Sequence, residues 1–126
     1  MDRAKRTGWR VLAALALLVL LEPLALAAGP GETVGVSSFR AVRYPTGVYI
    51  TWRTASERMI AGFRLWAGAQ ELTRQIIPAQ AAGQAQARQY DFWAARRWVG
   101  SPFRLGVVTR LGVIVVCGPV SAGRGR

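Results

Sequence analysis

The side chains best suited to acid–base chemistry are the four carboxylates past residue 27, which are Glu32, Glu57, Glu71 and Asp91. A glycosidase needs two carboxyl groups held at a fixed separation across its substrate, and no motif joins any two of these. The chain has no His and one Cys, which excludes Ser-His-Asp and Cys-His catalysis and Cys/His zinc sites. Clustered acidic oxygens for calcium and a Gly-rich nucleotide loop are also missing. We therefore expect no enzyme activity, no cofactor and no metal.

Arginine and tryptophan are the residues that could recognise a ligand. Residues 28–126 hold 13 Arg against 4 carboxylates, a formal net charge of +9. This charge could favour anionic partners such as cell-wall polymers, lipid head groups or nucleic acid. It could also reflect arginines scattered over a solvated surface, which we favour because no basic run here is longer than Arg96-Arg97. We expect no specific nucleic-acid site.

Residues 1–27 have the parts of a secretory signal peptide. Basic residues precede the apolar run VLAALALLVLL at 11–21, Glu22-Pro23 interrupts it, and Ala25-Leu26-Ala27 offers small side chains for cleavage. We predict cleavage after Ala27 and a secreted or cell-surface protein, with membrane contact only through this signal. The alternative is an uncleaved anchor, for which about 20 apolar residues are needed. The uninterrupted run has 11, and a longer span would include the carboxylate of Glu22.

From residue 35 onward, apolar and polar residues alternate as in strands with one buried face. The pattern predicts seven strands, at residues 36–42, 46–53, 62–67, 71–77, 88–93, 102–109 and 113–117. Turn residues separate these runs, and residues 78–88 are expected to form a loop. The sequence therefore predicts an all-β, seven-stranded antiparallel β-sandwich over 35–121, with a flexible linker at 28–34 and a disordered tail at 122–126.

The inward-facing positions of these strands predict the core. Its members are Val48, Ile50, Trp52, Phe63, Leu65, Tyr90, Phe92, Phe103 and Leu105. Cys117 alternates within the last apolar run, where a free Cys is commonly a small buried hydrophobe. In an exported protein an unpaired thiol could instead cross-link two copies. We predict that Cys117 is buried.

The run Thr51-Trp52-Arg53-Thr54-Ala55-Ser56-Glu57, followed by Ala61-Gly62-Phe63-Arg64-Leu65-Trp66, resembles a signature of fibronectin type III-like (immunoglobulin-like) modules in secreted bacterial proteins. Ile77-Pro78-Ala79-Gln80, Tyr90-Asp91-Phe92 and Gly118-Pro119-Val120 are similar to later parts of that pattern, in the same order. The resemblance covers nearly all of residues 35–121. It implies a seven-stranded, two-sheet sandwich with no catalytic site and with Trp52 in its core.

The chain departs from this family at one position. These sandwiches usually place a Tyr near the start of the sixth strand, where its hydroxyl bonds back to the backbone. The corresponding place is near Ser101, and Phe103 two residues later has no hydroxyl. Another group must make that bond, or the domain is less stable than its relatives. We read Ser56 and Glu57 as turn residues that satisfy backbone groups.

If the strands pair as the resemblance implies, Arg64, Trp66, Arg104 and Val108 share one outer sheet face. Arginine beside an aromatic ring suits recognition of sugars, anionic polymers or proteins. Trp93 and Trp98, which flank Arg96-Arg97, could add to it. The alternative is that Trp66 only covers the sheet beneath arginine stems.

These observations predict a non-catalytic β-sandwich of bacterial secreted or cell-envelope proteins that acts as a binding or spacer domain. We expect a monomer whose partner is an unidentified protein or polysaccharide of the envelope. The alternatives are an envelope protein anchored by its N-terminal helix, and a weak binder of anionic polymer or carbohydrate through the Arg/Trp face.

Overall fold

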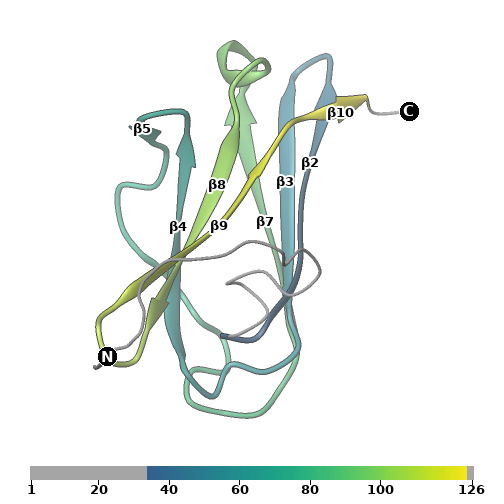
Figure 1. Ribbon diagram of the computed structural model, residues 1–126. Helices are drawn as coiled ribbons and strands as arrows, with labels where there is room; N and C mark the ends of the chain where they lie inside the picture. The colour runs from purple at the N-terminus through teal and green to yellow at the C-terminus, as the bar shows by residue number, and fades with distance from the viewer. Residues whose placement is uncertain (1–33, 125–126) are drawn as a thin grey trace, which may run out of the picture.

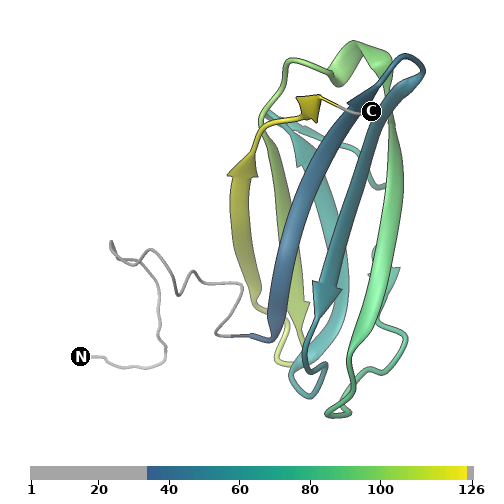
Figure 2. The same cartoon turned by 90° about the vertical axis from the view of Figure 1, so that its right-hand side faces the viewer.

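The computed structural model describes residues 34–124, which form two packed β-sheets (Figures 1 and 2). The strands are β2 (Val36–Tyr44), β3 (Gly47–Thr54), β4 (Ile60–Ala67), β5 (Gln70–Glu71), β6 (Ile77–Pro78), β7 (Arg88–Ala95), β8 (Phe103–Thr109), β9 (Ile114–Val120) and β10 (Gly123–Arg124). A 3₁₀ turn, η1 (Arg96–Trp98), follows β7. No helix in this part of the chain is long and apolar enough to cross a membrane. The predicted signal, its cleavage site, Glu32 and all of the linker before Val34 lie outside the described residues.

One sheet has the order β10-β2-β3-β7, and the other has the order β5-β4-β8-β9 with β6 also paired to β4. Each of these pairs is antiparallel except β10 with β2. Each sheet contributes alternate side chains to a shared core, as stacked sheets do. The predicted all-β class with two packed sheets is confirmed.

The core lies between the sheets around Trp52, which has no exposed surface. Its indole is stacked on the Tyr90 ring, with centroids 5.4 Å apart, and meets the Phe63 ring edge-on at 5.5 Å. The other residues expected inside are buried, except that Phe92 is only partly so.

The turns β3–β4 and β8–β9 lie at the lower end of the sandwich in Figures 1 and 2, and the β2–β3 turn lies at the upper end.

The strand expected at 71–77 is not continuous. The structure has only the short pairings of β5 and β6 with β4, and the residues between them leave the sheet. The Thr73 side chain explains the break, because its hydroxyl accepts a hydrogen bond from the Leu65 amide at 3.3 Å where a strand would offer a carbonyl. At this point the Thr73 side-chain oxygen takes the place of the backbone carbonyl that would accept this bond in a continuous strand.

The chain also stays ordered beyond residue 121, where we expected a tail. Gly123 and Arg124 pair in parallel with Val42 and Arg43 as β10. Ala122 packs against the core, so the last residues cross from one sheet to the other. This crossing covers the upper half of the β2 edge.

Candidate functional site

The outer face predicted from the sequence lies on β4 and β8. Trp66 is directly opposite Arg104, and Val108 is opposite Gly62, so the strand register places the predicted side chains on one face of the sheet. Arg64, Trp66, Arg104 and Val108 are all half-buried. The two apolar members, Trp66 and Val108, are not among the large hydrophobic side chains that are strongly exposed.

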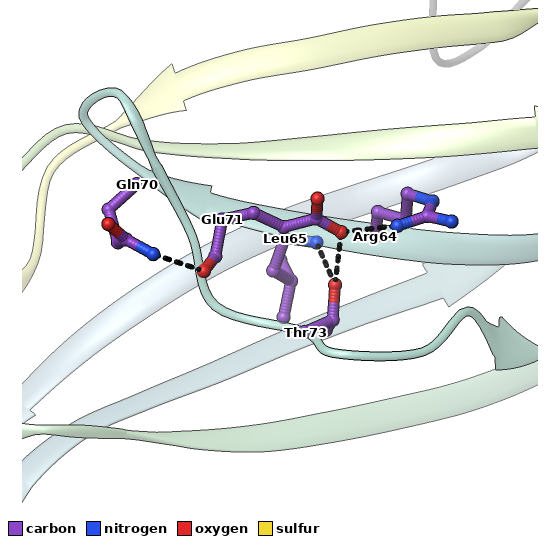
Figure 3. A network of polar contacts seen from close by, with 5 residues as sticks. All are labelled: Arg64, Leu65, Gln70, Glu71 and Thr73. Atoms are coloured by element: carbon purple, nitrogen blue, oxygen red, sulfur yellow. Dashed lines mark hydrogen bonds and ion pairs between the residues drawn. The ribbon is translucent and has the colours of Figure 1, made fainter.

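Arg64 on this face is already engaged by a neighbouring carboxylate (Figure 3). Its Nη1 lies 2.6 Å from Glu71 Oε2, which also accepts a hydrogen bond from the Thr73 hydroxyl at 3.0 Å. The Arg64 hydrogen bond is the main reason that the pKa of Glu71 lies below its ordinary value, and Thr73 adds to it. A ligand carboxylate would have to compete with Glu71 for this guanidinium.

The Trp66 ring lies over Gly106 of the neighbouring strand β8. A Cβ built on Gly106 would be 2.5 Å from Cζ3 of the Trp66 ring, so only a glycine permits this position. Aromatic side chains commonly cover a glycine in this way and restore packing on the sheet surface. The geometry favours the covering role of Trp66 over direct ligand contact.

The opposite sheet exposes a different aromatic cluster. Trp93 on β7 has 55% of its surface exposed and lies directly across from Tyr49 on β3. The Trp93 ring centroid is 4.9 Å from that of Tyr49 and 5.7 Å from that of Tyr44. The ring also lies next to Gly47, because a Cβ atom at this position would be only 3.7 Å from Trp93 Cε3. Three rings from three strands therefore meet on one outer face.

A hydrogen bond holds this cluster in place. The Tyr49 hydroxyl donates to Asp91 Oδ2 at 2.9 Å, and this bond is the largest cause of the raised pKa of Tyr49. Asp91 still presents a carboxylate oxygen next to the rings.

An open groove of about 420 Å³ continues from Trp93 around the edge of the sandwich. Its lining includes Gln70 and Leu72 from the β5 side, Phe92 and Trp93 from β7, and Arg97 and Trp98 from η1. The Arg97 guanidinium carbon is 5.1 Å from the Trp98 ring centroid, a cation–π distance. β7 pairs only with β3 among the described strands, so alternate backbone groups along the groove lack a strand partner. We call Tyr44, Tyr49, Trp93 and this groove the Trp93 surface.

Glu57 is wholly buried and acts within the fold. Its Oε2 accepts hydrogen bonds from the Thr54 hydroxyl at 2.8 Å and the Tyr90 hydroxyl at 2.6 Å, and its Oε1 accepts one from the Ala81 amide at 2.7 Å. The Tyr90 hydroxyl in turn accepts a bond from the Gln80 amide at 2.8 Å. The carboxylate thus ties the β3–β4 turn to β7 and to the loop before it. Residues 34–124 contain no group of three His, Cys, Asp or Glu side chains placed to hold a metal ion.

Phe103 is fully buried and supplies only apolar contact at the start of β8. A tyrosine hydroxyl bonds a backbone group elsewhere in the fold, because Tyr90 on β7 accepts a hydrogen bond from the Gln80 amide at 2.8 Å.

Cys117 is buried, as predicted, and its thiol is far from reactive. Burial raises the pKa of Cys117 to about 12. Since the thiolate is the reacting form of cysteine, this burial disfavours cross-linking of two copies through Cys117 in the folded protein.

We expect stability to fall at alkaline pH through two buried groups. Burial, with the bond to Glu57, raises the pKa of Tyr90 to about 12, and burial alone does so for Cys117. Between the unfolded and folded pKa values the unfolded chain has lost protons that the folded chain keeps, so the free energy of unfolding declines as pH rises. Each group contributes about 1.4 kcal/mol per pH unit in its window.

Urea unfolding at increasing pH measures this decline. It should begin near the unfolded Cys value of about 8.5 and steepen near the unfolded Tyr value of about 10. In Cys117→Ala the decline in the free energy of unfolding should begin only near pH 10, about where tyrosine loses its proton in the unfolded chain. Stability that stays constant from neutral pH to pH 11 would show that neither group is perturbed.

Comparison of the chain with protein-family models, with curated proteins and with solved structures found no match. The class of the protein is therefore given by its fold and its surfaces. It is an all-β protein of two packed sheets that exposes an aromatic cluster on one of them. The likeness to fibronectin type III modules rests on the motif residues alone.

Proposed function

We propose that this protein is a non-catalytic β-sandwich domain of secreted or cell-envelope proteins, of the fibronectin type III-like kind, that binds an envelope polysaccharide through the Trp93 surface. The exposure of Trp93 beside Tyr44 and Tyr49 carries the proposal. A single exposed hydrophobic side chain is normal on a protein surface, whereas contiguous exposed apolar groups mark interaction sites.

The chemistry of the cluster suits a sugar ring. Aromatic faces offer flat apolar contact to the C–H face of a sugar, while a few fixed polar groups set its orientation. Asp91 supplies an acceptor beside the rings, and Arg97 supplies donors in the groove. The excess of arginine favours acidic sugars over neutral ones.

The described carboxylates support a binding role rather than catalysis. Glu57 is buried with three donors, Glu71 is paired with Arg64, and Asp91 accepts from Tyr49. None of these carboxyl groups faces a second one across a cleft, which general acid–base hydrolysis of a glycoside requires.

Replacing Trp93 by Ala should weaken polysaccharide binding by about tenfold or more, because a central aromatic contact commonly contributes ~2 kcal/mol. Affinity electrophoresis in gels containing alginate, with dextran as the neutral comparison, measures the effect. Trp66→Ala is the matched control, since it removes the same side chain from the other sheet. Retained affinity in Trp93→Ala with loss in Trp66→Ala would move the site to the β4–β8 face and refute the proposal.

Unfolding curves must accompany both variants. Trp93 lies on the surface, so its removal should change the free energy of unfolding by no more than ~1 kcal/mol. Weak binding by a well-folded Trp93→Ala protein then reports on contact with the polysaccharide.

A further inference from the structure

The lower end of the sandwich exposes aliphatic side chains. Met59, on the β3–β4 turn, is 44% exposed, and Leu111, at the tip of the β8–β9 turn, is 79% exposed. Val113 and Ile114, which follow it, are 57% and 45% exposed. The Arg110 amide bonds the Met59 carbonyl at 2.9 Å, so the two turns form one surface. We call these four aliphatic residues the apolar end.

Charge around the apolar end has one sign. Arg58 and Arg110 are exposed on the same two turns. None of the three described carboxylates is exposed there. Glu57 is on the same turn as Met59 but is buried, Glu71 lies opposite Trp66 toward the other end of β4, and Asp91 is bonded to Tyr49 on an outer sheet face. Aliphatic side chains with basic neighbours are the composition that favours anionic lipid surfaces.

The chain enters the fold at this same end. β2, whose first residue is Val36, starts at the lower end of the sandwich in Figures 1 and 2. The 33 residues before the described part include the apolar run at 11–21. The residues before Val34 are therefore joined to the sandwich on the side of the apolar end.

We propose that the apolar end rests on an anionic lipid surface. Leu111 and Met59 insert between lipid chains, and Arg58 and Arg110 contact the phosphates. The Trp93 surface then faces away from the membrane, because Trp93 pairs with Tyr49 near the start of β3 while Met59 follows the end of that strand. The sandwich presents its aromatic cluster toward the polymer outside.

A second copy of the chain fits this end less well than lipid does. β9 is an edge strand without a charged residue, so two copies could pair along it. Such pairing would cover Ile114 and Val116, but it would leave Leu111 and Met59 on the turns in water. A lipid surface covers the whole apolar end at once.

The test places a fluorophore at the two ends of the protein as recovered from producing cells. Leu111→Cys labelled with bimane probes the apolar end, and Ala69→Cys, exposed on the β4–β5 turn at the other end, is the matched control. Buried Cys117 stays unlabelled in the folded protein. The vesicles are mixtures of phosphatidylglycerol and phosphatidylcholine with brominated acyl chains, which quench only fluorophores that enter the bilayer.

We expect a blue shift and quenching at Leu111 and neither at Ala69. The readout is local, so it does not depend on how residues 1–33 contribute to membrane binding. In protein labelled with bimane at Met59→Cys instead, the further change Leu111→Asp should reduce this insertion about tenfold, because burial of a Leu side chain is lost. Raising the salt concentration should weaken the insertion further, because salt screens the attraction between Arg58 and the lipid phosphates.

Three results would overturn the proposal: no response at Leu111, equal responses at both ends, or a blue shift at Leu111 without lipid in a protein that sediments as a dimer. The last would assign the apolar end to a second copy. Polysaccharide binding through Trp93 is measured without vesicles, so its success or failure is separate from this outcome.

Discussion

Replacement of Trp52 by Ala is expected to lower the free energy of unfolding by about 3–5 kcal/mol. The side chain has no exposed surface and contacts rings from both sheets, since Tyr90 lies on β7 and Phe63 on β4. Its removal leaves a cavity at the point where the sheets meet, and the strands cannot close around it without breaking their register. Small domains have total stabilities of about 5–15 kcal/mol, so the variant should be partly unfolded near physiological temperature.

Urea denaturation followed by far-ultraviolet circular dichroism measures the loss, and Trp52→Phe is the comparison. Among the described residues the Trp52 Nε1 has no hydrogen-bond partner. The Phe variant keeps ring contacts and removes this unpaired donor, so its cost should be well below that of Ala. Equal losses in the two variants would mean that the indole contributes through something other than packing and volume.

The core around Trp52 could be predicted from the sequence because it depends on a local signal. Alternation over a few residues assigns each side chain to one face of a strand, whichever strand lies beside it. Ile50 and Leu65 are therefore inside, as expected. Phe92 follows the same alternation but is only partly buried, because it lies on the edge strand β7 beside the groove.

The Trp93 surface could not be predicted in this way. The sequence suggested only that Trp93 could add to the face of Arg64 and Trp66, which is wrong because Trp93 lies on the opposite sheet. The meeting with Tyr49 and Tyr44 depends on which strand pairs with β7 and in what register. Tyr49 and Asp91, which bond each other there, are 42 residues apart. The pattern therefore drew attention to Arg64 and Trp66, which are close in the sequence, although Trp66 is the more covered of the two tryptophans.

Buried polar contacts were the other feature beyond the reach of sequence patterns. The Thr73 hydroxyl that interrupts the 71–77 strand acts on Leu65, and the apolar residues Leu72, Ile76 and Ile77 in this segment gave no sign of the break. Glu57 was assigned to a turn because it lies between two predicted strands. Its partners Ala81 and Tyr90 come 24 and 33 residues later, and only the folded chain brings them to one carboxyl group.

Glu57→Ala should therefore destabilise the protein about as strongly as Trp52→Ala, by roughly 3–5 kcal/mol, because a buried polar network loses its shared acceptor. The Thr54 hydroxyl, the Tyr90 hydroxyl and the Ala81 amide all lose a partner at once, and water cannot reach them without opening the turn. The measurement is urea unfolding, together with hydrogen exchange of the Gln80 and Ala81 amides.

Two further variants distinguish this network from simple loss of volume. Glu57→Gln keeps the size of the side chain, but its amide nitrogen cannot accept a bond, so it should fall between wild type and Ala. Tyr90→Phe removes one donor and frees the Gln80 amide, at a cost of about 1–2 kcal/mol. The losses in Glu57→Ala and Tyr90→Phe should not add in the double variant, because both remove the same bond. Full additivity of the two losses would mean that the Glu57 carboxylate does not connect the β3–β4 turn and the loop to β7. A Glu57→Gln protein as stable as wild type would mean the same.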